Sequence, residues 1–200
     1  MTLLALLAPA EILDRIAVTV GKHIIAESEI VRDLRIAAFL DGKMPDLSGP
    51  RKREAAGRLV DQYLVLEDAA QMRAPAPSAS EVDSLVEPLK LRYASADEYP
   101  SALKSAGITE TELREHLAAG LRMLRYTDLR FRPEVQLSDE DLRELNSSLA
   151  RDGVPAPDME RGRSALEQLF IDRRVMQALD RWLEAVRHTT PVAYREAAFQ

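Results

Sequence analysis

A short pair of β-strand patterns near the start of the chain constrains the fold most. Residues 17–30 read AVTVGKHIIAESEI, in which two β-branched runs meet at Gly21-Lys22. Such runs on either side of a glycine-containing dipeptide predict a β-hairpin, here at about 16–26. A lone two-stranded hairpin is only marginally stable in water and needs a third strand or a covering helix. The fold therefore depends on which other segment completes the hairpin.

Almost all of the remaining sequence has the pattern of helices. Helix-start signals and apolar spacing predict helices at about 28–41, 51–73, 79–93, 96–105, 109–131, 138–150 and 158–188. Glycine and proline concentrate between them, in DGKMPDLSGP, RAPAPS and RDGVPAPD, which predicts loops there. The predicted fold class is mainly α, with one small antiparallel sheet.

Several of these helices have a recognisable start. The S/T-x-x-E capping box pairs a hydroxyl with an orphan N–H of the first turn and returns a glutamate to the N–H of the cap. It occurs as Ser78 with Glu81, Ser95 with Glu98 and Thr109 with Glu112. Caps followed by negative charge also occur at Ser28 with Glu29, and at Ser138 with Asp139, Glu140 and Asp141.

The predicted helices carry apolar stripes that we expect to be buried. These are Leu59, Val60, Tyr63, Leu64 and Leu66; Leu113, Leu117, Leu121 and Leu124; and Leu169, Met176, Leu179, Leu183 and Val186, with Trp182 beside them. Phe39 and Trp182 are expected in the core. The last helix would be ~45 Å long if straight. It should therefore bridge two parts of the protein or present some apolar surface outward.

The segment after the last helix supplies the missing strand. Pro191 ends the helix and favours an extended conformation in Thr190 before it. Val192 and Tyr194 then alternate as in a strand. We therefore predict that the third strand comes from the far end of the chain and joins the N-terminal hairpin. This makes residues 11–200 a single helical domain.

The first ten residues, MTLLALLAPA, support two interpretations. Leu3 to Ala8 resembles the apolar part of a secretory signal, and Ala8-Pro9-Ala10 resembles a small-residue cleavage site, so residues 1–10 could be a signal-peptide remnant. The segment is short for a signal and lacks a basic start. The alternative is a frayed apolar N-terminus or the first turn of a helix.

Composition excludes several classes of function. A formal net charge of −6 disfavours nucleic acid as the main partner. The run RMLRYTDLRFR at 122–132 could form a basic patch, but a solvated helix face is the favoured interpretation. The absence of cysteine rules out disulfides, thiolate metal sites and cysteine nucleophiles. No stretch approaches the ~20 apolar residues that a membrane-spanning helix needs.

No motif in the sequence indicates catalysis. His23, His116 and His188 show neither metal-ligand spacing nor a Ser/Asp pairing signature. Asp139, Glu140, Asp141 and Glu144 gather at one helix start, where capping accounts for them. The glycines are scattered, with no two adjacent, so a phosphate-binding loop has no support. We therefore expect no enzyme, no cofactor and no metal site.

Both ends of the chain resemble one protein family. The hairpin AVTVGKHIIAESEI, followed by LVDQYLVLEDAAQM on the second helix, resembles the N-terminal region of SurA-type periplasmic chaperones. RWLEAVRHTTPVAY looks like the end of the same module, where a final helix and short strand return to the hairpin. The resemblance covers about 12–73 and 158–195. The middle helices match only in pattern.

The resemblance implies a holdase, which binds unfolded or partly folded polypeptides, typically secreted or outer-membrane proteins. It also implies a periplasmic or otherwise exported location. Family members commonly insert a parvulin-type prolyl isomerase domain before the last helix. The corresponding stretch here, Pro133 to Gly162, is short and carries nothing like a parvulin site. Isomerase activity is therefore not expected, although a prolyl isomerase with an unrecognised site is one alternative.

Client-binding residues are sought among apolar side chains that the helical stripes do not explain. Met44 and Leu47 lie in a Pro/Gly loop, and Tyr93 and Tyr99 flank a helix turn. Simple loop packing is the competing explanation for each. One functional alternative is a dedicated interaction or assembly module, including a homodimer formed by strand or helix exchange. Another is a cytosolic ribosome-associated chaperone.

Overall fold

The computed structural model describes residues 14–138, 140–141, 143–144, 147, 151 and 159–200. Side chains of 159–164 and of residue 166 are outside this description. The predicted signal remnant at residues 1–10 and much of the predicted helix at 138–150 therefore lie outside the described residues.

A three-stranded antiparallel sheet joins the two ends of the described chain, as predicted. Strands β1 (Ile16–Val20) and β2 (His23–Ala26) form the hairpin, and β3 (Val192–Tyr194) pairs with the other edge of β1, giving the order β2-β1-β3. Gly21 in the turn has φ +58°, which glycine adopts without strain, and its N–H donates to the Pro191 carbonyl at 2.8 Å. The turn of the hairpin is thus bonded to the residue that precedes β3.

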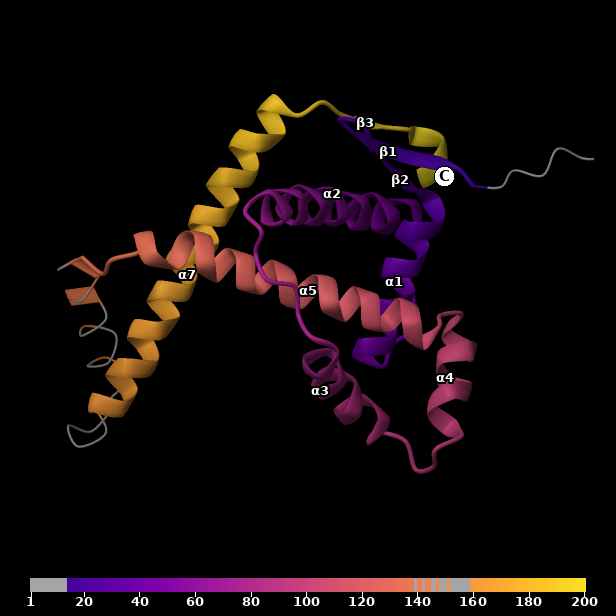
Figure 1. The fold of residues 1–200 in the computed structure, drawn as a ribbon, viewed down its shortest axis with the longest axis horizontal. Helices are drawn as coiled ribbons and strands as arrows, with labels where there is room; N and C mark the ends of the chain where they lie inside the picture. Colours follow the sequence, from indigo (N-terminus) through magenta and orange to yellow (C-terminus); the bar gives the residue numbers. More distant parts are fainter. Residues whose placement is uncertain (1–13, 139, 142, 145–146, 148–150, 152–158) are drawn as a thin grey trace, which may run out of the picture.

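Helices make up most of the described protein, and the mainly-α prediction is confirmed. They are α1 (Glu27–Asp41), α2 (Gly49–Gln71), α3 (Ala79–Lys90), α4 (Glu98–Ala106), α5 (Glu110–Phe131) and α7 (Met159–Thr189), with short 3-10 turns η1 (Arg132–Glu134) and η3 (Glu196–Phe199). Figure 1 shows α2 and α5 running side by side beneath the sheet, with α7 crossing the far end of α5. The helices α3 and α4 lie at the opposite end from the sheet.

Two of the three predicted capping boxes are confirmed. Ser78 and Thr109 each accept a hydrogen bond from the third residue of the helix, and the glutamate at that position accepts from the N–H of the cap. The Ser95 box is wrong, because α4 starts at Glu98 and the carboxylate of Glu98 accepts instead from the Ala94 N–H at 3.1 Å.

The prediction that Ser28 caps α1 is also wrong. Strand β2 runs directly into α1, so Ala26 is the cap, and its N–H donates to Glu29 at 2.8 Å. The Ser28 hydroxyl donates instead to Asp14. The Ser138 cap is formed, with its hydroxyl and N–H bonded to Asp141 at 2.6 and 2.9 Å.

The core consists of three apolar clusters. The first lies between the sheet, α2 and η3, and contains Ala17, Val18, Val20, Ile25, Ile30, Ala55, Ala56, Val60, Leu64, Ala198 and Phe199. The second joins α1, α3, α4 and α5 through Ile36, Val82, Val86, Leu89, Tyr99, Leu103, Ile108 and Leu113. The third joins α2, α5 and α7 through Val65, Ala69, Ala74, Tyr126, Phe131, Val175 and Leu179.

Three residues of the predicted stripes are exposed. Leu124 is 60% exposed, because α5 turns Tyr126 and Phe131 toward α7 at this point and leaves Leu124 facing outward. Leu169 and Met176 on α7 are more than half exposed, since the buried face of that helix carries Val175 together with Leu179, which the predicted stripe does include. The long last helix thus presents apolar surface outward.

Candidate functional site

The loop after α1 carries the most exposed large hydrophobic residue among those that the structure describes. Gly42 ends α1 in the left-handed region, at φ +67°, and its N–H donates to the Phe39 carbonyl at 3.1 Å. This cap turns the chain sharply away from the helix axis. The loop that follows leaves Met44 91% exposed. Met44 is therefore available to a partner without any rearrangement.

Three of the four predicted client-binding residues line one apolar pocket. It encloses about 460 Å³ between the end of α1, the following loop and α4. Its walls include Met44 and Leu47 from the loop and Tyr93 from the turn before α4. The remaining lining residues are Arg35, Phe39, Gly42, Lys43, Pro45, Ala102, Ser105, Ala106 and Gly107. We refer to this cavity as the apolar pocket.

The floor beneath Tyr93 is aromatic. The ring of Tyr93 lies 6.5 Å from that of Phe39 and 5.8 Å from that of Tyr99, measured between centroids. Tyr99 is only 4% exposed and belongs to the second core cluster. Its hydroxyl has no hydrogen-bond partner among the described residues. Burial, followed by the nearby carboxylate of Glu110, raises the pKa of Tyr99. Tyr99 thus supports Tyr93 from within the core.

A second pocket lies on the other side of Tyr93. It has a volume of about 450 Å³ and is bordered by Leu91, Tyr93, Tyr99 and Pro100, among others. Leu91 projects into solvent here. Its polar residues include Lys90 and Glu110, whose charged groups are 3.4 Å apart. Tyr93 therefore separates two adjoining hollows on this end of the molecule.

The apolar pocket has positive side chains at its edge. Arg35 and Lys43 line it, and none of its lining residues carries a carboxylate. The Arg35 guanidinium makes a long contact of 3.4 Å with the Gly107 carbonyl at the end of α4. Arg35 forms no ion pair with a carboxylate among the described residues. Lys43, in contrast, pairs with Asp41 at 3.1 Å.

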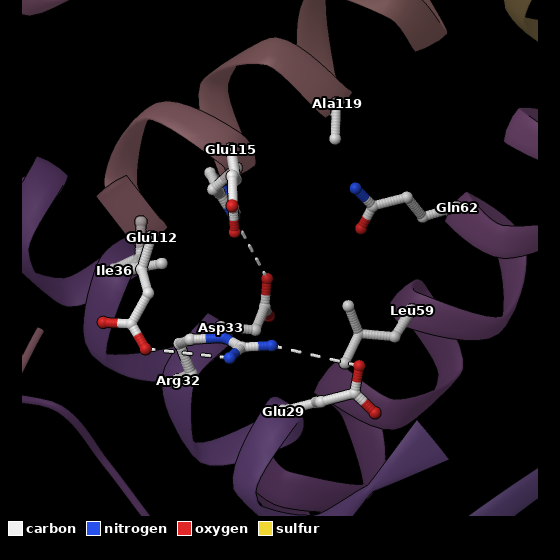
Figure 2. Close-up of a pocket in the computed structure, with 10 residues that line it drawn as sticks. Glu29, Arg32, Asp33, Ile36, Leu59, Gln62, Glu112, Glu115 and Ala119 are labelled. Carbon is white, nitrogen blue, oxygen red and sulfur yellow. Dashed lines mark ion pairs between the residues drawn. The ribbon is translucent and has the colours of Figure 1, made fainter. Parts of the chain in front are cut away.

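A smaller, polar cavity of about 160 Å³ lies between α1, α2 and α5 (Figure 2). Arg32 is held there between Glu112 and Glu29, at 3.6 and 3.9 Å, and His116 Nδ1 lies 3.5 Å from the Asp33 carboxylate. Glu29 and Glu112 also accept the capping hydrogen bonds of α1 and α5. Because these side chains already stabilise helix starts and helix contacts, their structural roles account for the charged residues that line this cavity.

The other groups considered from the sequence have structural surroundings. His23 stacks on Tyr63 with 3.9 Å between ring centroids, and His188 lies in the last turn of α7. Within the described ranges no three histidine, aspartate or glutamate residues are arranged to hold a metal ion. No helix in that part of the chain is both long and apolar enough to cross a bilayer.

Sequence reasoning missed part of the pocket wall. Phe39 was expected in the core, but it is half-buried and lines the pocket. Trp182, also expected in the core, is half-buried against the third cluster. Arg35 was not singled out at all. The sequence does contain a signal for the position of Arg35. Arg35 and Phe39 are four residues apart and therefore lie on the same face of α1, in the two turns before Gly42.

No protein-family model and no curated protein matches this chain. The case for binding at this site therefore rests on the geometry of the pocket and on the physical chemistry of its lining residues.

Proposed function

We propose that this protein is a non-catalytic chaperone, a holdase, that transiently binds apolar segments of unfolded or partly folded polypeptides. The observation that carries the proposal is the apolar pocket, with Met44 almost fully exposed at its rim and Leu47 and Tyr93 in its walls. Exposed apolar patches on soluble proteins commonly mark interaction surfaces. Methionine suits varied partners because its unbranched, polarisable side chain adapts to different shapes.

The size of the pocket sets the strength of binding. A volume of about 460 Å³ accommodates a few side chains of a client. Burying each large apolar side chain contributes roughly 1.5–3 kcal/mol. Association and ordering costs of roughly 4–15 kcal/mol oppose this gain. Binding should therefore be weak at each contact and rapidly reversible, as a holdase requires.

The cellular setting is part of the same proposal. The resemblance of both chain ends to SurA-type chaperones supports clients that are secreted or outer-membrane proteins. It also supports an exported, periplasmic location. Catalytic isomerisation has no part in the proposal, because binding alone accounts for the holding of clients.

Aggregation of denatured clients tests this function. Two unrelated guanidinium-denatured enzymes are diluted into buffer with increasing amounts of the protein, and light scattering is followed. We expect dose-dependent suppression that an inert protein of similar charge does not give. Absence of suppression with both clients would refute the holdase proposal.

A pair of methionine variants tests the site. Met44→Asp places a charge at the rim of the pocket and should weaken suppression severalfold. Met176→Asp introduces the same charge at another exposed methionine, on α7, and should leave suppression unchanged. Equal activity of the two variants would show that clients bind elsewhere.

A second candidate function, a self-assembling interaction module, is favoured by the sheet. β3 comes from the opposite end of the chain to β1, so the same strand from a second copy could occupy its place. Mass measurement by light scattering over a wide concentration range tests this alternative. A constant monomer mass would count against it.

A further inference from the structure

The charge around the apolar pocket is opposite to that of the protein as a whole. The chain has a formal net charge of −6, yet the pocket is lined by Arg35 and Lys43 and by no carboxylate. A cationic rim on an acidic protein disfavours cationic segments and favours anionic ones. The pocket therefore has the means to discriminate among apolar clients by charge.

Arg35 differs from the other arginines near α1, which are in ion pairs or, in the case of Arg92, donate a 3.0 Å hydrogen bond to the Leu40 carbonyl. Arg32, one turn earlier on α1, pairs with Glu29 and Glu112, and Arg58 pairs with Asp33. Arg35 has no such carboxylate partner among the described residues, and its guanidinium makes only the long contact with the Gly107 carbonyl there. That contact holds the guanidinium at the wall of the pocket. Most of its N–H donors are left for another acceptor.

Lys43 adds positive charge to the pocket, but its ammonium group is a less directional hydrogen-bond donor than the guanidinium of Arg35. Its ion pair with Asp41 joins side chains that are 73% and 62% exposed. Exposed pairs of this kind contribute about 0–1 kcal/mol and exchange readily with solvent. Asp41 does not line the pocket, although its carboxylate reduces the positive potential that Lys43 provides. Arg35 is therefore the main candidate for a directional contact.

We propose that the apolar pocket selects polypeptide segments in which an aspartate or glutamate stands beside a large apolar residue. The apolar side chain enters between Met44, Leu47 and Tyr93, while the carboxylate accepts hydrogen bonds from the Arg35 guanidinium. A planar guanidinium is well suited to this role because it can donate two parallel hydrogen bonds to one carboxylate. The inference rests on the proposed function and specifies its client class.

The test uses three fluorescently labelled peptides with the same Leu- and Phe-containing centre. They differ only in two flanking positions, which are glutamate, glutamine or lysine. Fluorescence anisotropy gives the Kd of each with the full chain at low and high salt. We expect the glutamate peptide to bind about fivefold more tightly than the glutamine peptide, and the lysine peptide to bind most weakly. High salt should reduce these differences.

Two arginine variants assign the preference to one residue. Arg35→Gln should remove the difference between the glutamate and glutamine peptides, whereas Arg35→Glu should favour the lysine peptide. Arg173→Gln makes the same charge change on α7, where Arg173 lies over Phe170, and should leave the preference intact. Circular dichroism confirms that each variant is folded before binding is measured.

The outcomes separate this inference from the proposed function. If none of the three peptides binds, the holdase proposal fails and the charge preference fails with it. If all three bind with equal affinity, binding of apolar segments stands and the charge preference is refuted. A preference for the glutamate peptide that survives in Arg35→Gln would also refute the inference, because a group other than Arg35 would then bind the carboxylate.

Discussion

Replacing Gly49 by alanine should destabilise this protein, whereas the same replacement at Gly120 should stabilise it. Gly49 is the first residue of α2, and η3 packs directly against it. A Cβ atom at Gly49 would lie 2.0 Å from the carbonyl oxygen of Phe199 and 3.2 Å from its carbonyl carbon. The obstructing atoms belong to the backbone, so a side-chain rotation cannot relieve the clash. Either η3 or the start of α2 has to move.

The magnitude follows from what that movement disturbs. Carbon–oxygen contacts normally lie at about 3.3–3.6 Å, so the two segments must separate by more than about 1 Å. η3 carries Phe199, which is 8% exposed, and Ala198, which is fully buried in the first core cluster. Overpacking of this kind typically costs about 1–3 kcal/mol. We therefore expect Gly49→Ala to lower the free energy of unfolding by about that amount.

Gly120 provides the matched control. It lies in the middle of α5, is exposed, and has no atom within 4 Å of the position of an added Cβ. Alanine there restricts the unfolded chain and favours the helix, so it should raise the free energy of unfolding by about 0.5–1 kcal/mol. The same chemical change is thus expected to have opposite signs at two helical positions.

Urea denaturation measures both effects. Far-UV circular dichroism reports the helices, and fluorescence of Trp182 reports the third core cluster, where its ring lies 6.2 Å from that of Tyr126. In thermal unfolding, each kcal/mol of change in the free energy of unfolding should shift Tm by about 2–4 °C for a domain of this size. If Gly49→Ala is as stable as the unchanged protein while Gly120→Ala is stabilised, the inferred docking of η3 on α2 is wrong.

Two further changes probe polar contacts of the third cluster and of the Ser138 cap. Tyr126→Phe removes the buried hydroxyl that donates to Asp68, and should lower the free energy of unfolding by about 1–2 kcal/mol in the same urea assay; an unchanged value would contradict the contact. Hydrogen bonds from Ser138, followed by the ion pair with Arg174, hold the pKa of Asp141 well below its usual range. Because a lowered folded-state pKa stabilises the protein above the unfolded value of about 3.9, that contribution should be lost as pH falls below about 4. Unfolding measured from about pH 6 down to pH 2 should therefore show the stability advantage over Asp141→Asn shrinking below about pH 4; a constant difference would refute the assignment.

Much of the fold was predictable because its signals are local. The β-branched runs around Gly21 predict the hairpin, and the proline before Val192 predicts the strand that completes it. Ser78 and Thr109 are followed by glutamate at the required spacing, and both caps form. The failures occur where a neighbouring element overrides the local signal. β2 runs into α1 before Ser28, so Ser28 is not the cap. On α5, packing against α7 buries Tyr126 and Phe131 and leaves Leu124 exposed.

The candidate site was only partly predictable for a related reason. Met44, Leu47 and Tyr93 could be singled out as apolar residues without a helical stripe, and the structure places them in one pocket. Tyr99 met the same criterion, yet it is buried beneath Tyr93. The role of Arg35 depends on which carboxylates lie near it in space. Sequence spacing along α1 cannot supply that information, because the neighbours of the Arg35 guanidinium come from the end of α4 and from Gly107, which follows it.

The position of β1 in the centre of the sheet has a consequence for the way the chain is made. β1 and β2 are synthesised well before β3, which comes only after the six helices that the structure describes between them. Until then one edge of β1 has no partner, and unpaired edges invite pairing with other chains. Closing the sheet is also the most non-local step of folding, which slows folding in general. A protein that we propose shields unfolded polypeptides is therefore itself exposed to misassembly from the synthesis of β1 until the synthesis of β3.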